Sequence, residues 1–282
     1  MSWALVLVAP PEDLEIRAAQ LFDQGALGVE LQEPGMALMP GTPPLPEGCG
    51  RAIAHFASAE DASESARLFG AEPPVEVPER DWSVAWRTHH RPMQVGPRSW
   101  VHPPWEKPPR PGVAVAIDPG MAFGTGSHPT TALCLERCDE LLSRFPGADL
   151  LDVGTGSGVI ALLAKMLGAG RVVGTENDPV SLEAARQGAA LNGIDGVDWV
   201  LAEDPAAVPG RFKIVIANIL LNTLEELAPA IAGKVADGGR LVLSGLLAAQ
   251  GDAAERAYVA QGLRPVARKE RERWLRVELS RP

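Results

Sequence analysis

The chain has 282 residues, 46% of them hydrophobic, and a formal net charge of −10. This length is enough for one large or two ordinary domains, and no stretch approaches the roughly 18 uninterrupted apolar residues of a membrane span. We therefore expect no membrane partner. An acidic chain repels phosphate backbones, so we expect no nucleic-acid partner. A basic protein would be attracted, although the negative charge could equally serve only to keep the protein soluble. Only three cysteines are present, Cys49, Cys134 and Cys138, which favours a reducing cytoplasm over a disulfide framework. With no further ligands nearby, we expect Cys134 and Cys138 to be buried rather than to bind a metal.

Residues 1–79 are predicted to form a small α+β domain of their own. Apolar alternation and helix signals predict strands near 4–8, 27–31, 52–56 and 75–77, and helices over 11–24 and 59–69. The order β-α-β-β-α-β is that of the ferredoxin-like split βαβ arrangement. That fold hosts many activities and predicts none by itself.

Residues 80–112 are interpreted as a connector rich in tryptophan and proline. It holds Trp82, Trp86, Trp100 and Trp105, whereas a flexible linker would be polar and poor in aromatic residues. Two interpretations stay open: a segment packed against both domains, or an exposed contact surface.

Residues 113–282 alternate strands and helices, which predicts a mainly parallel sheet covered on both faces. Strands are expected near 149–153, 171–176, 198–202, 213–218, 240–244, 264–269 and 274–279, and helices near 129–144, 158–167, 180–192, 220–235 and 247–261. Only Arg271, Glu272 and Arg273 separate the last two strands, so these should form an antiparallel hairpin at one edge.

The run DVGTGSG at 152–158 follows an apolar strand and precedes an apolar helix, as in the entry to a nucleotide-type pocket. Its glycines Gly154, Gly156 and Gly158 give the pattern G-x-G-x-G. A dinucleotide fingerprint would require glycine at 159, where this chain has Val159. The early third glycine favours S-adenosylmethionine over NAD, because the methionine part of that cofactor carries no pyrophosphate.

Carboxylates follow the next two predicted strands. Glu176 lies about twenty residues after the glycine turn, a spacing at which it can accept hydrogen bonds from both ribose hydroxyls. Asp178 directly precedes Pro179 and better suits a helix start. Asp204 would either meet the adenine amino group or begin a short turn, and the sequence does not separate these alternatives.

Asn218 ends the apolar strand near 213–218, where a buried amide must find partners. Its carbonyl oxygen could hold an amine hydrogen and aim the nitrogen lone pair at a methyl group, although the residue could also merely cap the following helix. We interpret Asn218 as the catalytic residue.

Upstream, residues 118–131 combine three glycines, one aromatic ring and several hydroxyls just before a helix. Such a loop can fold over a ligand, with Phe123 covering it and Thr131 hydrogen-bonding to it. His128 at this kind of position is interpreted as structural.

These stretches together resemble the PrmA family, the bacterial methyltransferases of large-subunit ribosomal protein eleven. The matching stretches are DWSVAW at 81–86, DPGMAFGTGSHPTT at 118–131, DVGTGSGVIA at 152–161, NDP at 177–179 and ANIL at 217–220. The second stretch is the specific one, since most class I methyltransferases share the glycine turn. The resemblance is strong from about residue 80 onward, and residues 1–79 match in layout more than in identity.

The resemblance implies a Rossmann-like class I methyltransferase domain with a seven-stranded sheet, preceded by a ferredoxin-like domain that grips the ribosomal protein. It implies S-adenosylmethionine as cofactor, in a site lined by Thr131, Gly154, Glu176 and Asn218. It also implies lysine side chains, with the N-terminal α-amine as a further acceptor, as the methylated groups. Glu176 stands where the family usually has aspartate, so the carboxylate is retained one methylene further out.

The reaction expected from this resemblance is an in-line displacement in which a neutral amine attacks the methyl carbon of the sulfonium. Lysine, with a pKa of about 10.4, is nearly all cationic at neutral pH, so the site must bind or generate the neutral amine, and desolvation would help. Asn218 would orient the nitrogen, and the proton would leave to water.

Two other interpretations stay open. Within the same class, the methylated protein could be another one, such as an electron-transfer flavoprotein subunit. From a different class, the chain could be an NAD-dependent oxidoreductase or a non-catalytic cofactor-binding scaffold. Val159 argues against the oxidoreductase, and the presence of both Glu176 and Asn218 argues against the scaffold.

Overall fold

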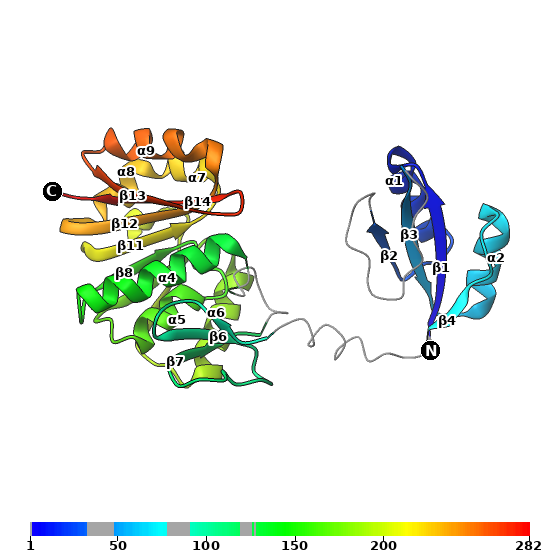
Figure 1. Ribbon diagram of the computed structural model, residues 1–282, viewed down its shortest axis with the longest axis horizontal. Helices are drawn as coiled ribbons and strands as arrows, with labels where there is room; N and C mark the ends of the chain where they lie inside the picture. Colours follow the sequence, from blue (N-terminus) through cyan, green and yellow to red (C-terminus); the bar gives the residue numbers. More distant parts are fainter. Residues whose placement is uncertain (1, 33–47, 78–90, 119–125, 127) are drawn as a thin grey trace. The chain divides into compact units, whose positions relative to one another are not determined.

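The computed structural model describes residues 2–32, 48–77, 91–118, 126 and 128–282 (Figure 1). The chain divides into two compact units, Met1–His89 and His90–Pro282. Within the described residues, the helices are all too short or too polar to cross a membrane.

The first unit is a four-stranded antiparallel sheet with two helices packed on one face. Its elements are β1 (Ser2–Ala9), α1 (Pro11–Asp23), β2 (Gly28–Gln32), β3 (Gly50–Phe56), α2 (Ala59–Phe69) and β4 (Val75–Val77). The strands are ordered β2-β3-β1-β4, and every neighbouring pair is antiparallel. Along β1, Leu5 and Leu7 are buried against the helices whereas Val6 and Val8 are exposed, because successive side chains point to opposite faces.

The second unit begins with a three-stranded sheet that lies partly inside the predicted connector. It consists of β5 (Met93–Gln94), β6 (Ser99–His102) and β7 (Val113–Ala116), in that order. Trp100 on β6 is buried, and the carboxylate of the fully buried Asp139 accepts hydrogen bonds from the Arg98 backbone N–H (3.0 Å) and the Ser99 hydroxyl (2.7 Å). Residues 93–94 and 99–102, which fall within the connector predicted over 80–112, are therefore strands of the second unit, and these contacts fix them to it. Trp82 and Trp86 lie outside the described residues.

A seven-stranded sheet forms the centre of the second unit. Its strands are β8 (Leu150–Val153), β9 (Val172–Glu176), β10 (Val197–Leu201), β11 (Phe212–Asn218), β12 (Val235–Leu247), β13 (Arg264–Arg271) and β14 (Trp274–Ser280). They are ordered β10-β9-β8-β11-β12-β14-β13; the first five are parallel, and β14 is antiparallel to both of its neighbours. The predicted mainly parallel sheet with an antiparallel edge hairpin is confirmed.

Helices cover both faces of this sheet (Figure 1). One face carries α4 (Pro129–Arg144), α5 (Val159–Met166) and α6 (Pro179–Asn192), and the other carries α7 (Leu221–Glu226), α8 (Ala228–Gly233) and α9 (Gly251–Val259). Short 3₁₀ turns occupy Pro205–Ala207 and Ala248–Gln250. The helix predicted over 220–235 is two helices, because Pro229 in the first turn of α8 has no N–H to continue the α7 hydrogen-bond ladder.

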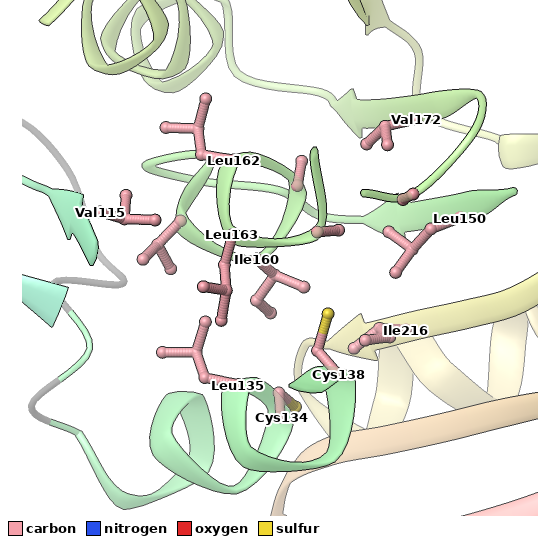
Figure 2. Close-up of a cluster of buried hydrophobic side chains, with 14 of the residues drawn as sticks. Val115, Cys134, Leu135, Cys138, Leu150, Ile160, Leu162, Leu163, Val172 and Ile216 are labelled. Atoms are coloured by element: carbon pink, nitrogen blue, oxygen red, sulfur yellow. The ribbon is translucent and has the colours of Figure 1, made fainter. Parts of the chain in front are cut away.

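Figure 2 shows the core between α4, α5 and the sheet, where side chains from both helices meet Leu150, Val172 and Ile216. Cys134 and Cys138 lie in this core with no exposed surface, and both are free thiols. Burial raises the pKa of the Cys134 thiol to about 12, which keeps it protonated. The two cysteines act as small apolar residues, as the sequence predicted.

A buried ion cluster joins β14 to its neighbours. The Glu278 side chain is fully buried and lies 2.8 Å from Arg137 Nε on α4 and 3.4 Å from Arg240 Nε on β12. A buried carboxylate needs such partners, because an unpaired charge in the interior costs several kcal/mol.

Candidate functional site

A cavity of about 540 Å³ lies at the carboxyl ends of the parallel strands. In parallel sheets these ends face one edge, which is where ligands of open α/β folds bind. Its wall includes Gly154 after β8, Glu176 at the end of β9, Glu203 after β10 and Asn218 at the end of β11. All four of these strand ends therefore contribute a lining residue.

The glycine turn after β8 brings its backbone to the cavity wall. Gly154 has φ +69°, a left-handed conformation that favours glycine, and a Cβ at this position would lie 2.4 Å from Ile219 Cγ2. The turn is held by a hydrogen bond from Thr155 N–H to the Thr175 carbonyl (2.9 Å) and by another from the Thr155 hydroxyl to Asp152 Oδ2 (2.6 Å). Gly154 and Gly156 both line the cavity.

Glu176 is anchored to the glycine turn and to the start of α6. Its Oε2 accepts from Gly156 N–H at 2.9 Å, and Oε1 accepts from the N–H groups of Asn177 (2.9 Å) and Asp178 (3.2 Å). These bonds orient the carboxylate at the cavity wall, and Oε2 keeps a lone pair for a further donor.

Two other acidic residues have capping roles. The Asp178 carboxylate accepts from the Ser181 hydroxyl at 2.7 Å and from Val180 N–H and Ser181 N–H, each at 3.0 Å. The hydroxyl hydrogen bond first, and then the two backbone hydrogen bonds, lower the pKa of Asp178. Asp204 Oδ1 accepts from Ala206 N–H at 2.7 Å and begins the 3₁₀ turn. Of the two alternatives for Asp204, the structure shows the turn, and the lining residue at this point is the preceding Glu203.

Asn218 lines the cavity, and its Nδ2 donates to Thr131 Oγ1 at 3.3 Å. Its Oδ1 is buried and has no hydrogen-bond partner within the described part of the chain. Thr131 is itself 1% exposed and is not a lining residue, although the adjacent Thr130 is. Phe123, the remaining expected site residue, lies outside the described residues.

Two further lining residues, His128 and Trp274, are not among the site residues predicted from the sequence, where His128 is interpreted as structural. His128 and Trp274 stack edge to face, with ring centroids 4.7 Å apart and planes at 68°. The backbone N–H of Thr130 donates to His128 Nδ1 at 3.4 Å, so His128 also caps α4. Trp274 starts the C-terminal hairpin strand, and only the fold brings it to His128.

Gly245 also lines the cavity, and the apolar pattern of its strand did not predict this position. It sits within β12 at φ +82°, where the pairing with β14 changes register between Leu243 and Leu246. A Cβ there would lie 2.4 Å from the Ile219 carbonyl oxygen. A glycine inside an apolar strand is a known signal for such an irregularity.

Asp152, beneath the glycine turn, is almost completely buried. Desolvation, and then the charge of Glu176, raise its pKa to about 7 against the opposing hydrogen bonds from Thr155 and Ala161. A carboxyl group beneath the cavity wall therefore changes charge near neutral pH.

Comparison with known proteins agrees with this geometry. The family model described as Ribosomal protein L11 methyltransferase (PrmA) matches residues 50–282. The chain is 42% identical over 287 residues to the ribosomal protein L11 methyltransferase of Myxococcus xanthus (strain DK1622), covering 99% of this chain and 98% of that relative. It is 39% identical over 296 residues to the protein of that name from Pseudomonas paraeruginosa (strain DSM 24068 / PA7), covering 98% of each.

A solved structure is also similar. The crystal structure of ribosomal protein L11 methylase from Lactobacillus delbrueckii subsp. bulgaricus matches with a TM-score of 0.63 and 30% sequence identity, over 68% of this chain and 98% of that chain. The class I methyltransferase fold and the resemblance carried by the sequence motifs are confirmed. The chain belongs to the PrmA family of ribosomal protein L11 methyltransferases.

Proposed function

We propose that this protein transfers methyl groups from S-adenosylmethionine to amines of ribosomal protein L11, on lysine side chains and on the N-terminal α-amine. The observation that carries the proposal is the meeting of the glycine turn, the Glu176 carboxylate and the Asn218 amide in one cavity. The substrate is suggested by the names of the relatives, which are called ribosomal protein L11 methyltransferases.

The cavity fits the cofactor in size and in chemical groups. Its volume of about 540 Å³ falls in the range of small-molecule sites. Glu176 Oε2 can accept a ribose hydroxyl, and the apolar side chains of Val153 and Pro205 offer a wall for a planar base. When bound, the cofactor supplies an electrophilic methyl group on its sulfonium.

Asn218 would position the attacking amine. Because Nδ2 donates to Thr131, the group left to meet an amine N–H is the carbonyl oxygen Oδ1, which can only accept. Accepting one amine hydrogen turns the nitrogen lone pair toward the methyl group, and such orientation supplies much of a displacement's rate. Lysine must lose its proton before attack, and the half-buried apolar side chain of Ile219 beside Asn218 favours the neutral amine by desolvation.

The first unit, Met1–His89, is proposed to recognise the protein substrate, since the second unit contains the whole cavity. Its sheet has one face free of the two helices, with Val6 and Val8 exposed on β1.

The deciding experiment is methyl transfer from labelled S-adenosylmethionine to purified ribosomal protein L11, followed by intact mass and peptide mapping. We expect mass gains in steps of one methylene on lysine-containing peptides, lost with Asn218→Ala or Glu176→Ala. Asn222→Ala, an exposed asparagine on α7, is the matched control and should retain activity. Cofactor binding without a mass gain would overturn the assignment of ribosomal protein L11 as the substrate. An electron-transfer flavoprotein subunit is then the next protein to test. Failure to bind the cofactor would overturn the methyltransferase proposal itself.

A further inference from the structure

Trp199 lies on β10, which is an edge strand of the seven-stranded sheet. Its side chain is partly buried and packs against the core that contains α5. Trp199 does not belong to the described residues that line the cavity. The role of this large ring therefore follows from what it packs against, and two glycines meet it.

The first of these glycines is Gly174 on β9, which pairs directly with Trp199. A Cβ at Gly174 would lie 2.7 Å from Trp199 Cζ3 and 2.9 Å from Trp199 Cε3. The φ angle of Gly174 lies outside the left-handed region, so the backbone itself would accept a side chain. The ring therefore requires glycine at this position, and an aromatic ring that covers a glycine on the neighbouring strand is a known stabilising pair in sheets.

The second is Gly158, the last glycine of the G-x-G-x-G turn and the residue before α5. A Cβ at Gly158 would lie 2.8 Å from Trp199 Cη2 and 3.0 Å from Ala185 Cβ on α6. Gly154 and Gly156 line the cavity, whereas Gly158 is not among the described lining residues. The last glycine of such a turn serves close packing, and in this chain the Trp199 ring is one of its packing partners.

The ring thus lies beneath the two chain segments that carry Glu176 and Gly156. Gly174 is two residues before Glu176 on β9. Gly158 is two residues after Gly156 in the turn. Because Glu176 Oε2 accepts from Gly156 N–H at 2.9 Å, a shift of either segment would change the geometry of this link. A ring that fills the space under both segments restricts such shifts, since packed interiors leave little room for movement.

We infer that Trp199 is a positioning residue for the cofactor site: its ring holds the glycine turn and the end of β9 in the arrangement that binds S-adenosylmethionine, without contact with the cofactor. The inference rests on the methyltransferase chemistry of the proposed function and not on the identity of the methylated protein. A ring that only filled the core would affect stability alone, so the two roles predict different results.

The test measures the Kd for S-adenosylmethionine in Trp199→Leu and Trp199→Phe by isothermal titration calorimetry. Leucine leaves the space under the turn unfilled, and a turn that adopts the binding arrangement about one-tenth of the time binds about tenfold more weakly. We therefore expect the Kd of Trp199→Leu to rise about tenfold. Phenylalanine keeps a ring beside Gly174 but is too short to reach Gly158, so the Kd of Trp199→Phe should fall between those of Trp199→Leu and wild type. The kcat at saturating cofactor and substrate should stay within about twofold, because the defect lies in binding.

Gly174→Ala tests the same contact from the other strand. Its methyl group would displace the Trp199 ring, so the Kd for S-adenosylmethionine should again rise about tenfold. In the Trp199→Leu background the alanine substitution should weaken binding little further, because residues in contact are not additive. Full additivity of the two substitutions would overturn the inference.

Phe212→Leu is the matched control. It removes a ring that is 1% exposed at the amino end of β11, opposite the edge that carries the cavity. This variant should lose free energy of unfolding in urea and keep the wild-type Kd. If Trp199→Leu behaves in the same way, losing stability with an unchanged Kd, the ring is core packing only and the inference is wrong.

Amide hydrogen exchange supplies a readout that needs no cofactor. Peptides that cover the turn at 152–158 should exchange faster in Trp199→Leu than in wild type and Phe212→Leu, because the loosened turn opens locally. Equal exchange in all three would refute the support of the turn by Trp199. If the wild-type chain fails to bind S-adenosylmethionine, the proposed function falls while the exchange measurement still decides whether Trp199 holds the turn. Trp199→Phe gives the same comparison if the leucine variant does not fold.

Discussion

The Glu176 carboxylate accepts a hydrogen bond from the backbone N–H of Gly156, with Oε2 and N 2.9 Å apart. Two strand ends are thereby linked at the cavity wall, since Gly156 belongs to the turn after β8 and Glu176 ends β9. The same side chain that would receive the cofactor's ribose also stabilises the loop that the cofactor must approach. Loss of the Glu176 charge should therefore affect both the binding of the cofactor and the conformation of the glycine turn.

Glu176→Gln should weaken S-adenosylmethionine binding about tenfold, or about 1.4 kcal/mol, because hydrogen bonds to a charged acceptor are stronger than those to a neutral one. Isothermal titration calorimetry measures this directly. Glu183→Gln, an exposed position on α6, is the control and should bind as the wild type does. An unchanged Kd for Glu176→Gln would show that the Glu176 carboxylate does not bind the cofactor.

Asn218→Ala should lower the single-turnover rate of methyl transfer about 100-fold, because it removes the only group proposed to orient the amine. The Kd for the cofactor should change far less, which rapid-quench and titration experiments can separate. Full turnover with normal cofactor binding would show that Asn218 is not catalytic.

Gly245→Ala should destabilise the protein much more than Gly193→Ala. Both glycines have positive φ, +82° and +62°, so both variants bear the cost of a left-handed alanine. Only at Gly245 would the new methyl group meet backbone, at 2.4 Å from the Ile219 carbonyl oxygen, whereas nothing lies within 4 Å of the Gly193 position. Urea titration of both variants gives the difference in free energy of unfolding, and equal losses would contradict the predicted clash.

Asp152 should make stability depend on pH. Its pKa is about 7 in the folded chain, against about 3.9 when unfolded, so between these values the folded state binds more protons. The free energy of unfolding must then fall as pH rises through this window, by up to about 4 kcal/mol from this group. Asp152→Asn does not titrate, so its stability relative to wild type should improve between pH 4.5 and pH 8. Urea titrations at both pH values measure this, and a constant difference would refute the raised pKa.

The parts of the site on parallel strands were predictable from sequence. An apolar run that ends in glycines or in a polar side chain marks a strand end, and parallel strands bring those ends together, which gave Gly154, Glu176 and Asn218. Trp274 was not predictable, because its contact with His128 depends on where the antiparallel hairpin lies in the sheet. In LVLSGLL the glycine signals an irregular strand, but the sequence does not show that the change in register places Gly245 at the cavity.

The fold was predictable to a similar extent and for similar reasons. Long periodic segments such as α4 and β11 are determined by their own pattern of apolar residues. The strands β5 and β6 have two and four residues, too few for a period to be read. Their place is set by the Asp139 carboxylate on a distant helix, which local sequence does not encode.

The position of β14 between β12 and β13 has a consequence for proteolysis. A cut at the turn after Arg271, followed by loss of the last strand, would open the middle of the sheet rather than trim its edge. The Glu278 carboxylate would be lost with the strand, which would leave Arg137 with Glu140 alone and would remove the ion pair of Arg240. Loss of one partner from a buried ion cluster costs several kcal/mol, a large part of the stability of a domain. We expect a chain nicked at this turn to unfold and be degraded, so that cleavage there would remove the protein altogether rather than leave a weakened one.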